Sequence, residues 1–336
     1  MSNLSNLPNL LNLPNLRNLL DLLDLPFVVG YLRSALPSNA SPLKVKFWGT
    51  RGSIPCPGSE RAKYGGNTSC LQVIGGTEVV ILDAGTGIRE LGLELAALRK
   101  PLKINLLLTH THWDHIQGFP FFTPIYIPGN EITIFGPRAL EKSLEEALMF
   151  QMQYSYFPVK GVELAAKIKF RELDGEDEFR IGDTEFRTKS MNHPIRVLAF
   201  RFTRGNSSGA YTGDNEPYYD VLADSNKSDP GAQNRREFIN ECNDKVVQFV
   251  KGCDLLVADA QYTDEEYEQK RGWGHSSISH VMDLAQKGQV KTLSLFHHEP
   301  THNDNVLASI ERKAKLAAKK RKLNCFMAKE GQTVDV

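Results

Sequence analysis

The segment that most constrains this chain is "LLLTHTHWDHIQGF" (residues 106–119), which places three histidines and an aspartate directly after an apolar run. The apolar run is typical of a buried strand, and because side chains alternate along a strand, His110 and His112 point the same way. A short helix then carries Asp114 and His115 away from that pair. Burying these groups without a cation would leave polar atoms desolvated. The segment therefore predicts two neighbouring metal positions with nitrogen and oxygen ligands, which suit Zn²⁺, Mn²⁺ or Fe²⁺.

Two metal ions need further ligands, and the chain offers candidates directly after other predicted strands. "KSMNHPIRV" supplies His193, "AYTGDNEP" supplies Asp214, and "LSLFHHEP" supplies His297 and His298. Ends of strands are where α/β folds assemble their sites. Either histidine of the last pair can serve as a ligand by this criterion alone.

Predicted strands and helices are interleaved from residue 43 to the end of the chain. Strands are expected at 44–50, 71–76, 78–85, 103–109, 131–136, 166–173, 184–190, 197–203, 208–213, 254–260, 291–297 and 324–328. Helices are expected at 88–99, 113–117, 138–152, 235–250, 276–287 and 304–321. Strands gathered into sheets with interleaved helices, in two similar halves, predict one α/β domain over 43–336, a four-layer αβ/βα sandwich.

Residues 1–42 have a different character. Asn or Asp recurs at every third position up to Asp24 with Leu after each, and this period of three builds no stable apolar stripe on a helix. We predict a low-complexity tail and linker that are disordered. The alternative is a segment that uses its leucines to bind a partner or a membrane surface.

Composition narrows the function classes. Lys+Arg and Asp+Glu both total 40, so no net charge attracts a long polyanion, which makes nucleic acid the less favoured partner. The basic run at 311–322 is the exception, and such a run is usually the solvated face of a helix. Five scattered cysteines without CxxC spacing favour a reducing compartment. No apolar run approaches the ~20 residues of a membrane span and no signal-peptide pattern is present, so we expect a cytoplasmic protein without a membrane partner.

The motifs resemble those of the metallo-β-lactamase-fold hydrolases, over roughly residues 43–336. "THTHWDH" is similar to the signature motif of that family and "ILDAGTG" to the aspartate motif that precedes it. The resemblance implies a site with two divalent ions, Zn²⁺ in the first place. Its implied ligands are His110, His112 and His193 for one ion, Asp114, His115 and His297 for the other, and Asp214 as the bridge. It also implies that Asp83 supports the ligand loop and that His298 lies at the edge of the site.

The stretch from "VADAQYTDEEY" through "GHSS" to "LFHHEP" resembles the ribonuclease Z and phosphodiesterase branch of the family. In this branch a histidine in the second motif assists the leaving oxygen or steadies the phosphate. The resemblance assigns that role to His275, with Asp259 orienting it, and Asp114 joins His275 as a catalytic residue. Arg51 and Asn67, in turns that precede and follow "PCPG", are candidate phosphate contacts.

Together these features predict a dinuclear metal phosphodiesterase in which a metal-bound hydroxide attacks a small phosphodiester, in the first place a 3′,5′-cyclic nucleotide. Ribonuclease Z enzymes grip tRNA with a protruding arm, whereas residues 194–213, between His193 and Asp214, have room only for two strands and a turn. The extra length at 216–238 is expected to roof the site. The resemblance adds a homodimer as an expectation.

Three other functions stay open at this point. The first is a tRNA 3′-end processing endoribonuclease. The second is a hydrolase of a lactone, thioester or β-lactam, which leaves the resemblance around His275 unexplained. The third is a non-catalytic metal-binding interaction module, against which the full set of expected ligands argues.

Overall fold

The computed structural model describes residues 42–138, 141–222 and 231–336. Nearly all of the tail and linker predicted over 1–42 lies outside these residues. Within the described part of the chain, no helix combines the length and the apolar character needed to cross a bilayer.

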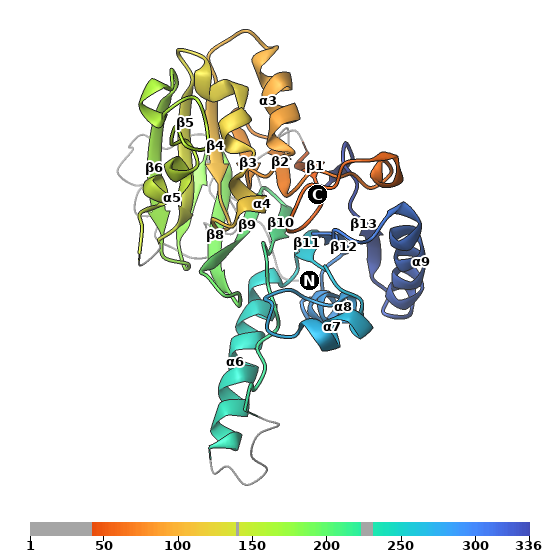
Figure 1. Ribbon diagram of the computed structural model, residues 1–336. Helices are drawn as coiled ribbons and strands as arrows, with labels where there is room; N and C mark the ends of the chain where they lie inside the picture. Colours follow the sequence, from red (N-terminus) through yellow and green to blue (C-terminus); the bar gives the residue numbers. More distant parts are fainter. Residues whose placement is uncertain (1–41, 139–140, 223–230) are drawn as a thin grey trace, which may run out of the picture. The chain divides into compact units, whose positions relative to one another are not determined.

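Two mixed sheets of seven strands each form the centre of the fold (Figure 1). The first sheet consists, in spatial order, of β14 (Thr333–Asp335), β1 (Lys44–Gly49), β2 (Cys70–Ile74), β3 (Val79–Leu82), β4 (Lys103–Leu107), β5 (Glu131–Pro137) and β6 (Lys167–Leu173). The second consists of β13 (Asn324–Met327), β12 (Thr292–Phe296), β11 (Leu255–Asp259), β10 (Ser207–Tyr211), β9 (Val197–Arg204), β8 (Thr184–Met191) and β7 (Glu178–Ile181).

Helices cover the outer face of each sheet. The first sheet is covered by α3 (Ile88–Ala96), α4 (Trp113–Ile116) and α5 (Leu144–Phe150), which pack in one apolar cluster with β3, β4 and β5. The second is covered mainly by α6 (Ala232–Val250), α8 (Ile278–Lys287) and α9 (Asp304–Lys320). A third cluster fills the space between the sheets. The predicted four-layer αβ/βα sandwich is confirmed.

The central strands are apolar on both faces because both faces are buried. On β9, Leu198, Phe200 and Phe202 point into the layer between the sheets, while Val197 and Ala199 point toward α6. On β4, Leu107 points between the sheets and Leu106 toward the helices. This arrangement explains why these strands appear in the sequence as apolar runs.

Strand direction sets the place of the site. Strands β3 to β6 run parallel to one another, as do strands β10 to β13. Parallel strands bring their carboxyl ends to a common edge, and the loops after β3, β4, β10, β11 and β12 carry the candidate site residues.

The structure differs from the sequence prediction at several elements. The helix predicted over 138–152 begins only at Leu144, because Ser143 caps it and exchanges hydrogen bonds with Glu146. Strand β7, the short edge strand β14 and helix α7 (Asp264–Lys270) had no counterpart in the prediction. Short strands and single helical turns carry too few periodic positions to stand out in a sequence.

The described part of the segment 216–238 contacts both α6 and the loop before His275. Asp220 pairs with Arg235 on α6, with 3.2 Å between Oδ1 and Nε, and Tyr218 exchanges hydrogen bonds with Asn243 on the same helix. The C-terminal part of α6 packs on the second sheet through Val246 and Val250, and its N-terminal end extends away from both sheets (Figure 1). The roof over the site stays a prediction.

The packing between the two sheets leads to a prediction about the stability of the protein. Phe200 is fully buried in it. We expect Phe200→Ala to lower the free energy of unfolding by about 3–5 kcal/mol, since it leaves a cavity that the sheets cannot close. Leu316→Ala, on the exposed face of α9, should stay within about 0.5 kcal/mol of the native protein. Urea unfolding checks both values, and a loss below about 1 kcal/mol for Phe200→Ala would show that this layer is not tightly packed.

Candidate metal centre

The predicted ligands converge where the two sheets present the carboxyl ends of their strands. His110 and His112 follow β4, and α4 then turns Asp114 and His115 inward. Asp214 follows β10, and His297 follows β12 in a left-handed conformation with φ 62°. Strand and helix ends from both halves of the fold thus build one centre.

The first group of ligand atoms comes from His110, His112, His193 and Asp214, which lie within 4.8 Å of one another. His193 Nε2 is 3.2 Å from His112 Nδ1, and His110 Nε2 is 3.5 Å from Asp214 Oδ2. Three imidazoles and one carboxylate oxygen thus face a common point.

The second group consists of Asp114, His115, Asp214 and His297, again within 4.8 Å of one another. His115 Nε2 and His297 Nε2 lie 3.2 and 3.3 Å from Asp214 Oδ1, and His297 Nε2 lies 3.1 Å from Asp114 Oδ2. Asp214 therefore gives Oδ2 to the first group and Oδ1 to the second, which is the geometry of a bridging carboxylate.

These residues fit a pair of divalent cations. His110 Nε2 and Asp214 Oδ1 are buried and have no hydrogen-bond partner, a costly state for a polar atom in a protein interior. Two pairs of imidazole nitrogens face each other, His112 with His193 at 3.2 Å and His115 with His297 at 3.4 Å. A cation in each group would satisfy these atoms, and the mixed nitrogen and oxygen donors suit Zn²⁺, Mn²⁺ or Fe²⁺.

The ligand rings are oriented by hydrogen bonds to their other nitrogens, as metal-binding histidines usually are. His115 Nδ1 donates to Asp83 Oδ2 at 2.8 Å, and Asp83 also accepts from Tyr211 Oη and from the backbone N–H of Thr109. Asp83 thus lies directly behind the ligand loop, where the sequence placed it.

Two further contacts hold the remaining rings. His193 Nδ1 donates to the carbonyl of Gly274 at 2.8 Å, and His297 Nδ1 lies 3.0 Å from Gln261 Oε1. The ring of His297 is therefore turned by a side chain on the loop after β11.

The charges of the centre favour cation binding. Burial alone would raise the pKa of Asp214, but His115 and His297 hold that pKa well below its usual value, and Asp114 is lowered in the same way by His115. Burial lowers the pKa of His110 and of His193. His115 differs, because burial is outweighed by the carboxylates of Asp214, Asp114 and Asp83, which raise its pKa well above the usual value. The site therefore presents ionised carboxylates, and a cation bound there would take the place of the proton on His115.

His275 lies beside this centre, paired with Asp259 at the end of β11. Its Nδ1 is 2.9 Å from Asp259 Oδ2 and its ring stacks on His297 with 5.0 Å between centroids. Burial disfavours the charged imidazole, but the carboxylates of Asp259, Asp214 and Asp114 together outweigh burial and raise the pKa of His275 to about 9, with Asp259 contributing most. His275 is thus held as a proton carrier next to the metal ligands.

Three other sequence candidates lie apart from the ligand atoms. The Arg51 guanidinium is fully buried and donates to the carbonyls of Gly65, Glu299 and His302, so its placement does not favour a phosphate contact. Asn67 donates to Glu330. His298 donates Nε2–H to the carbonyl of Ala328, so of the two adjacent histidines only His297 reaches the metal ligands.

Sequence reasoning missed three residues that shape the centre. Gln261 orients His297, Tyr211 donates to Asp83, and Glu216 accepts hydrogen bonds from the backbone of the loop that precedes His275. All three lie at or just beyond a strand end, which was the only available signal. Their residue types are too common in turns and cores to mark a site.

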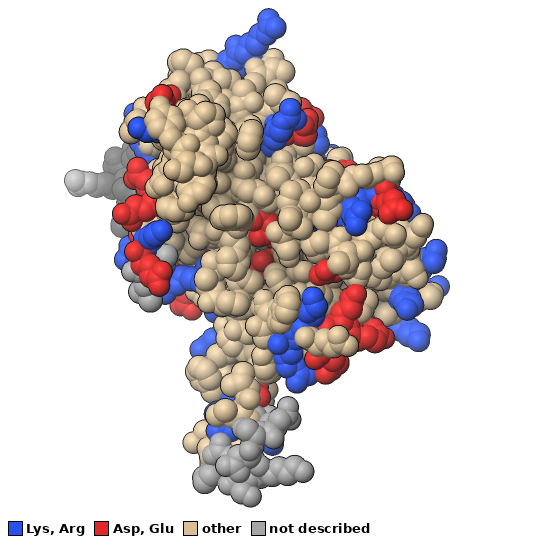
Figure 2. Space-filling view, viewed as in Figure 1, with Lys and Arg blue, Asp and Glu red and all other residues tan. Residues whose placement is uncertain are grey.

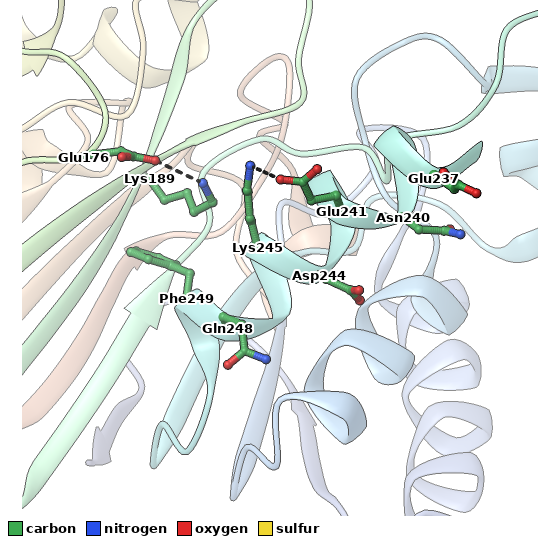
Figure 3. Close-up of a pocket in the computed structure, with 9 residues that line it drawn as sticks. All are labelled: Glu176, Lys189, Glu237, Asn240, Glu241, Asp244, Lys245, Gln248 and Phe249. Carbon is green, nitrogen blue, oxygen red and sulfur yellow. Dashed lines mark ion pairs between the residues drawn. The ribbon is translucent and has the colours of Figure 1, made fainter. Parts of the chain in front are cut away.

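Figure 2 shows acidic side chains recessed in the middle of the face that it draws, with uncharged surface around them. A separate pocket lies between β8 and α6, lined by polar side chains and by Phe249 (Figure 3). Two ion pairs lie in this pocket, Lys189 with Glu176 at 3.8 Å and Lys245 with Glu241 at 2.7 Å. Every candidate metal-binding group in the described part of the chain instead shares Asp214.

Comparison with known proteins shows which proteins this chain resembles. A family model for the beta-lactamase superfamily domain matches residues 78–228. Ribonuclease Z of Thermoplasma acidophilum is 25% identical over 308 residues, covering 82% of this chain and 92% of that protein. Yeast PDE1 superimposes with a TM-score of 0.60 at 14% identity, covering 88% of this chain and 100% of the other. Human tRNase Z, short form, gives 0.56 at 18% identity, covering 87% and 99%.

The two solved structures support the fold, and the family model matches a part of the chain that is shorter than half of it. The bridging Asp214 and the two ligand groups agree with the dinuclear site that the resemblance implied. The chain has the metallo-β-lactamase fold and is similar over most of its length to ribonuclease Z of Thermoplasma acidophilum.

Proposed function

We propose that this metal-dependent hydrolase is a phosphodiesterase that cleaves RNA in the manner of ribonuclease Z, with the 3′ end of precursor tRNA as its substrate. The observation that carries the proposal is similarity to ribonuclease Z over 82% of this chain, together with a complete ligand set beside the His275–Asp259 pair. This reverses the order in which the sequence ranked RNA and a cyclic nucleotide.

The residues divide the chemistry among them. One divalent ion would be held by His110, His112 and His193, and the other by Asp114, His115 and His297. Asp214 would bind both ions. Such ions lower the pKa of water toward neutrality and neutralise charge on a phosphoryl group. We propose Zn²⁺, given the histidine-rich donor set, with Mn²⁺ and Fe²⁺ as alternatives.

His275 supplies the part of the reaction that the ions do not. Hydrolysis breaks the bond between phosphorus and the leaving oxygen, and that alkoxide must gain a proton. Asp259 holds Nδ1 of His275, which leaves Nε2 to give its proton to the leaving oxygen. Asp259 also keeps the imidazole charged before the reaction.

The surface provides one feature that fits an RNA substrate. Helix α9 exposes five basic side chains on a protein without net charge: Arg312, Lys313, Lys315, Lys319 and Lys320. Lys and Arg side chains are visible at the edge of the molecule where Figure 1 places this helix (Figure 2). Basic side chains gathered on one helix bind phosphate groups along a nucleic acid.

A cyclic nucleotide is the second candidate, and one observation favours it. Strands β9 and β10 form a tight hairpin around Gly205 and Asn206, so no arm projects between His193 and Asp214. If the substrate is small, the protein needs no such arm.

Turnover of a substrate panel tests the proposal. We expect the Zn²⁺-loaded protein to remove the 3′ trailer of a precursor tRNA and to hydrolyse cAMP, cGMP and pyrimidine cyclic nucleotides at least about tenfold less efficiently. Gel analysis of the trimmed RNA and chromatography of the nucleotides give kcat/KM for each. Cyclic-nucleotide hydrolysis without trimming would overturn the RNA function.

We also propose a compartment and an oligomeric state for this protein. All five cysteines are free, which supports the reducing cytoplasm as the compartment. A homodimer stays a prediction, which sedimentation equilibrium checks.

A further inference from the structure

Two of the three tryptophans are exposed: Trp113 begins α4, which carries metal ligands, and Trp273 lies in the loop that leads to His275. Trp113 is 78% exposed and Trp273 is 59% exposed, whereas Trp48 is 8% exposed. An indole buries a large apolar surface when it finds a partner, so leaving two of them in solvent has a cost. Their shared location therefore suggests a ligand that covers them.

The two tryptophans are next in sequence to residues that contact one metal ligand, His193. Trp113 follows His112, whose Nδ1 lies 3.2 Å from His193 Nε2. Trp273 precedes Gly274, whose carbonyl accepts a hydrogen bond from His193 Nδ1 at 2.8 Å. Both tryptophans thus stand one residue away from groups that contact the ring of His193.

The loop that carries Trp273 is held in one conformation. The buried carboxylate of Glu216 accepts hydrogen bonds from the backbone N–H groups of Gly272 at 2.8 Å and of Gly274 at 3.0 Å. Both glycines have positive φ, 88° and 89°, and a Cβ on Gly274 would lie 2.3 Å from His193 Nδ1. A loop fixed in this way presents its indole without an ordering cost when a ligand binds.

Positive charge accompanies the exposed indole. Lys270 Nζ lies 4.3 Å from the ring centroid of Trp273, and the guanidinium of the adjacent Arg271 lies 5.8 Å from the ring of Tyr267. Glu268 is the acidic group that faces them, 3.4 Å from Arg271 Nη2. Aromatic rings interleaved with basic side chains are the surface on which nucleobases stack while phosphates are held alongside.

We propose that Trp113 and Trp273 form a stacking site for a nucleobase next to the phosphodiester that the metal centre cleaves. The proposal rests on the proposed phosphodiesterase function and adds the part of the substrate that this function leaves unassigned. The phosphate lies at the metal ligands, and the base of the adjoining nucleotide stacks on the exposed indoles. Stacking tolerates every base, so the site favours nucleotides over base-free phosphodiesters without selecting a sequence.

Indole fluorescence tests the site directly. The Zn²⁺-loaded full chain is titrated with adenosine 5′-monophosphate and with ribose 5-phosphate, which carry the same phosphate and differ in the base. We expect the nucleotide to bind at least about tenfold more tightly and to quench the emission. Trp113→Ala and Trp273→Ala should each lose most of this preference, Trp113→Phe should keep it, and Phe238→Ala, an exposed aromatic on α6, should behave as the native protein. Equal binding of the two ligands by the native protein would overturn the proposal.

Cleavage of RNA separates this proposal from the function on which it rests. Precursor RNA with an abasic residue on either side of the cleaved bond is compared with the complete RNA. We expect the ratio of kcat/KM for complete to abasic RNA to be about ten to a hundred in the native protein and to approach one in Trp113→Ala. An equal loss on both substrates would mark a structural role and overturn the stacking site. Preference for the nucleotide in the titration without any RNA cleavage would instead overturn the RNA function and leave the stacking site standing.

Discussion

Replacing Asp214 with Asn should remove phosphodiester hydrolysis and lower the bound metal from about two ions per chain to one or fewer. Asp214 is 2% exposed, and its two oxygens reach the two ligand groups separately. The amide keeps one oxygen but brings an NH₂ donor to the other group, where it repels a cation. Loss of a partner behind a ligand costs about 10–100-fold in metal affinity or activity, and loss of the shared ligand should exceed that range.

Metal analysis and heat denaturation check this prediction together. Metal that binds only the folded chain stabilises it, so a chelator should lower the Tm of the native protein. In Asp214→Asn the chelator should shift Tm far less. Asp254→Asn is the matched control, because this half-buried carboxylate at the start of β11 pairs with Lys291 and Ser208 and lies outside the ligand groups. An Asp214→Asn protein that still holds two ions and still hydrolyses its substrate would contradict the bridging role.

The ligand positions were predictable because backbone geometry alone constrains them. His110 and His112 sit two residues apart at the end of a buried strand, and Asp214 and His297 follow strands of the other half. Once strands run parallel, their carboxyl ends share an edge whatever the loops do. The choice between His297 and His298, by contrast, depends on the left-handed backbone at His297, which a pair of identical residues cannot reveal.

The residues that orient the metal ligands, and the true position of Arg51, could not be predicted from the sequence. Glu216 and Gln261 act through hydrogen bonds to residues 58 and 36 positions away along the chain, a pairing that only the folded loops create. Arg51 looked like a phosphate contact because it lies in a Gly-rich turn, but three backbone carbonyls turn its guanidinium into the protein. The local sequence does not distinguish an arginine whose guanidinium is buried against backbone carbonyls from one whose guanidinium is exposed.

Replacing His275 with Ala should lower cleavage of RNA by about 10²- to 10⁴-fold while both metal ions stay bound. His275 contacts Asp259 through Nδ1 and stacks on His297. It belongs to neither of the two ligand groups described above, so its removal leaves their ligand atoms in place. Asp259→Asn should give a smaller loss, because it removes the charge that holds the imidazole protonated and leaves the ring in place.

The nature of the leaving group distinguishes a proton donor from a residue that merely shapes the site. RNA cleavage expels an alkoxide that must be protonated, whereas p-nitrophenolate leaves without a proton. If His275 donates that proton, His275→Ala should lose far less activity on bis-p-nitrophenyl phosphate than on RNA. His280→Ala is the control. The His280 imidazole, on α8, packs against Tyr267 of α7 and belongs to neither group of metal ligands. Equal losses on both substrates, or loss of a metal ion, would mean that His275 maintains the geometry of His297, and the leaving oxygen would then need another donor.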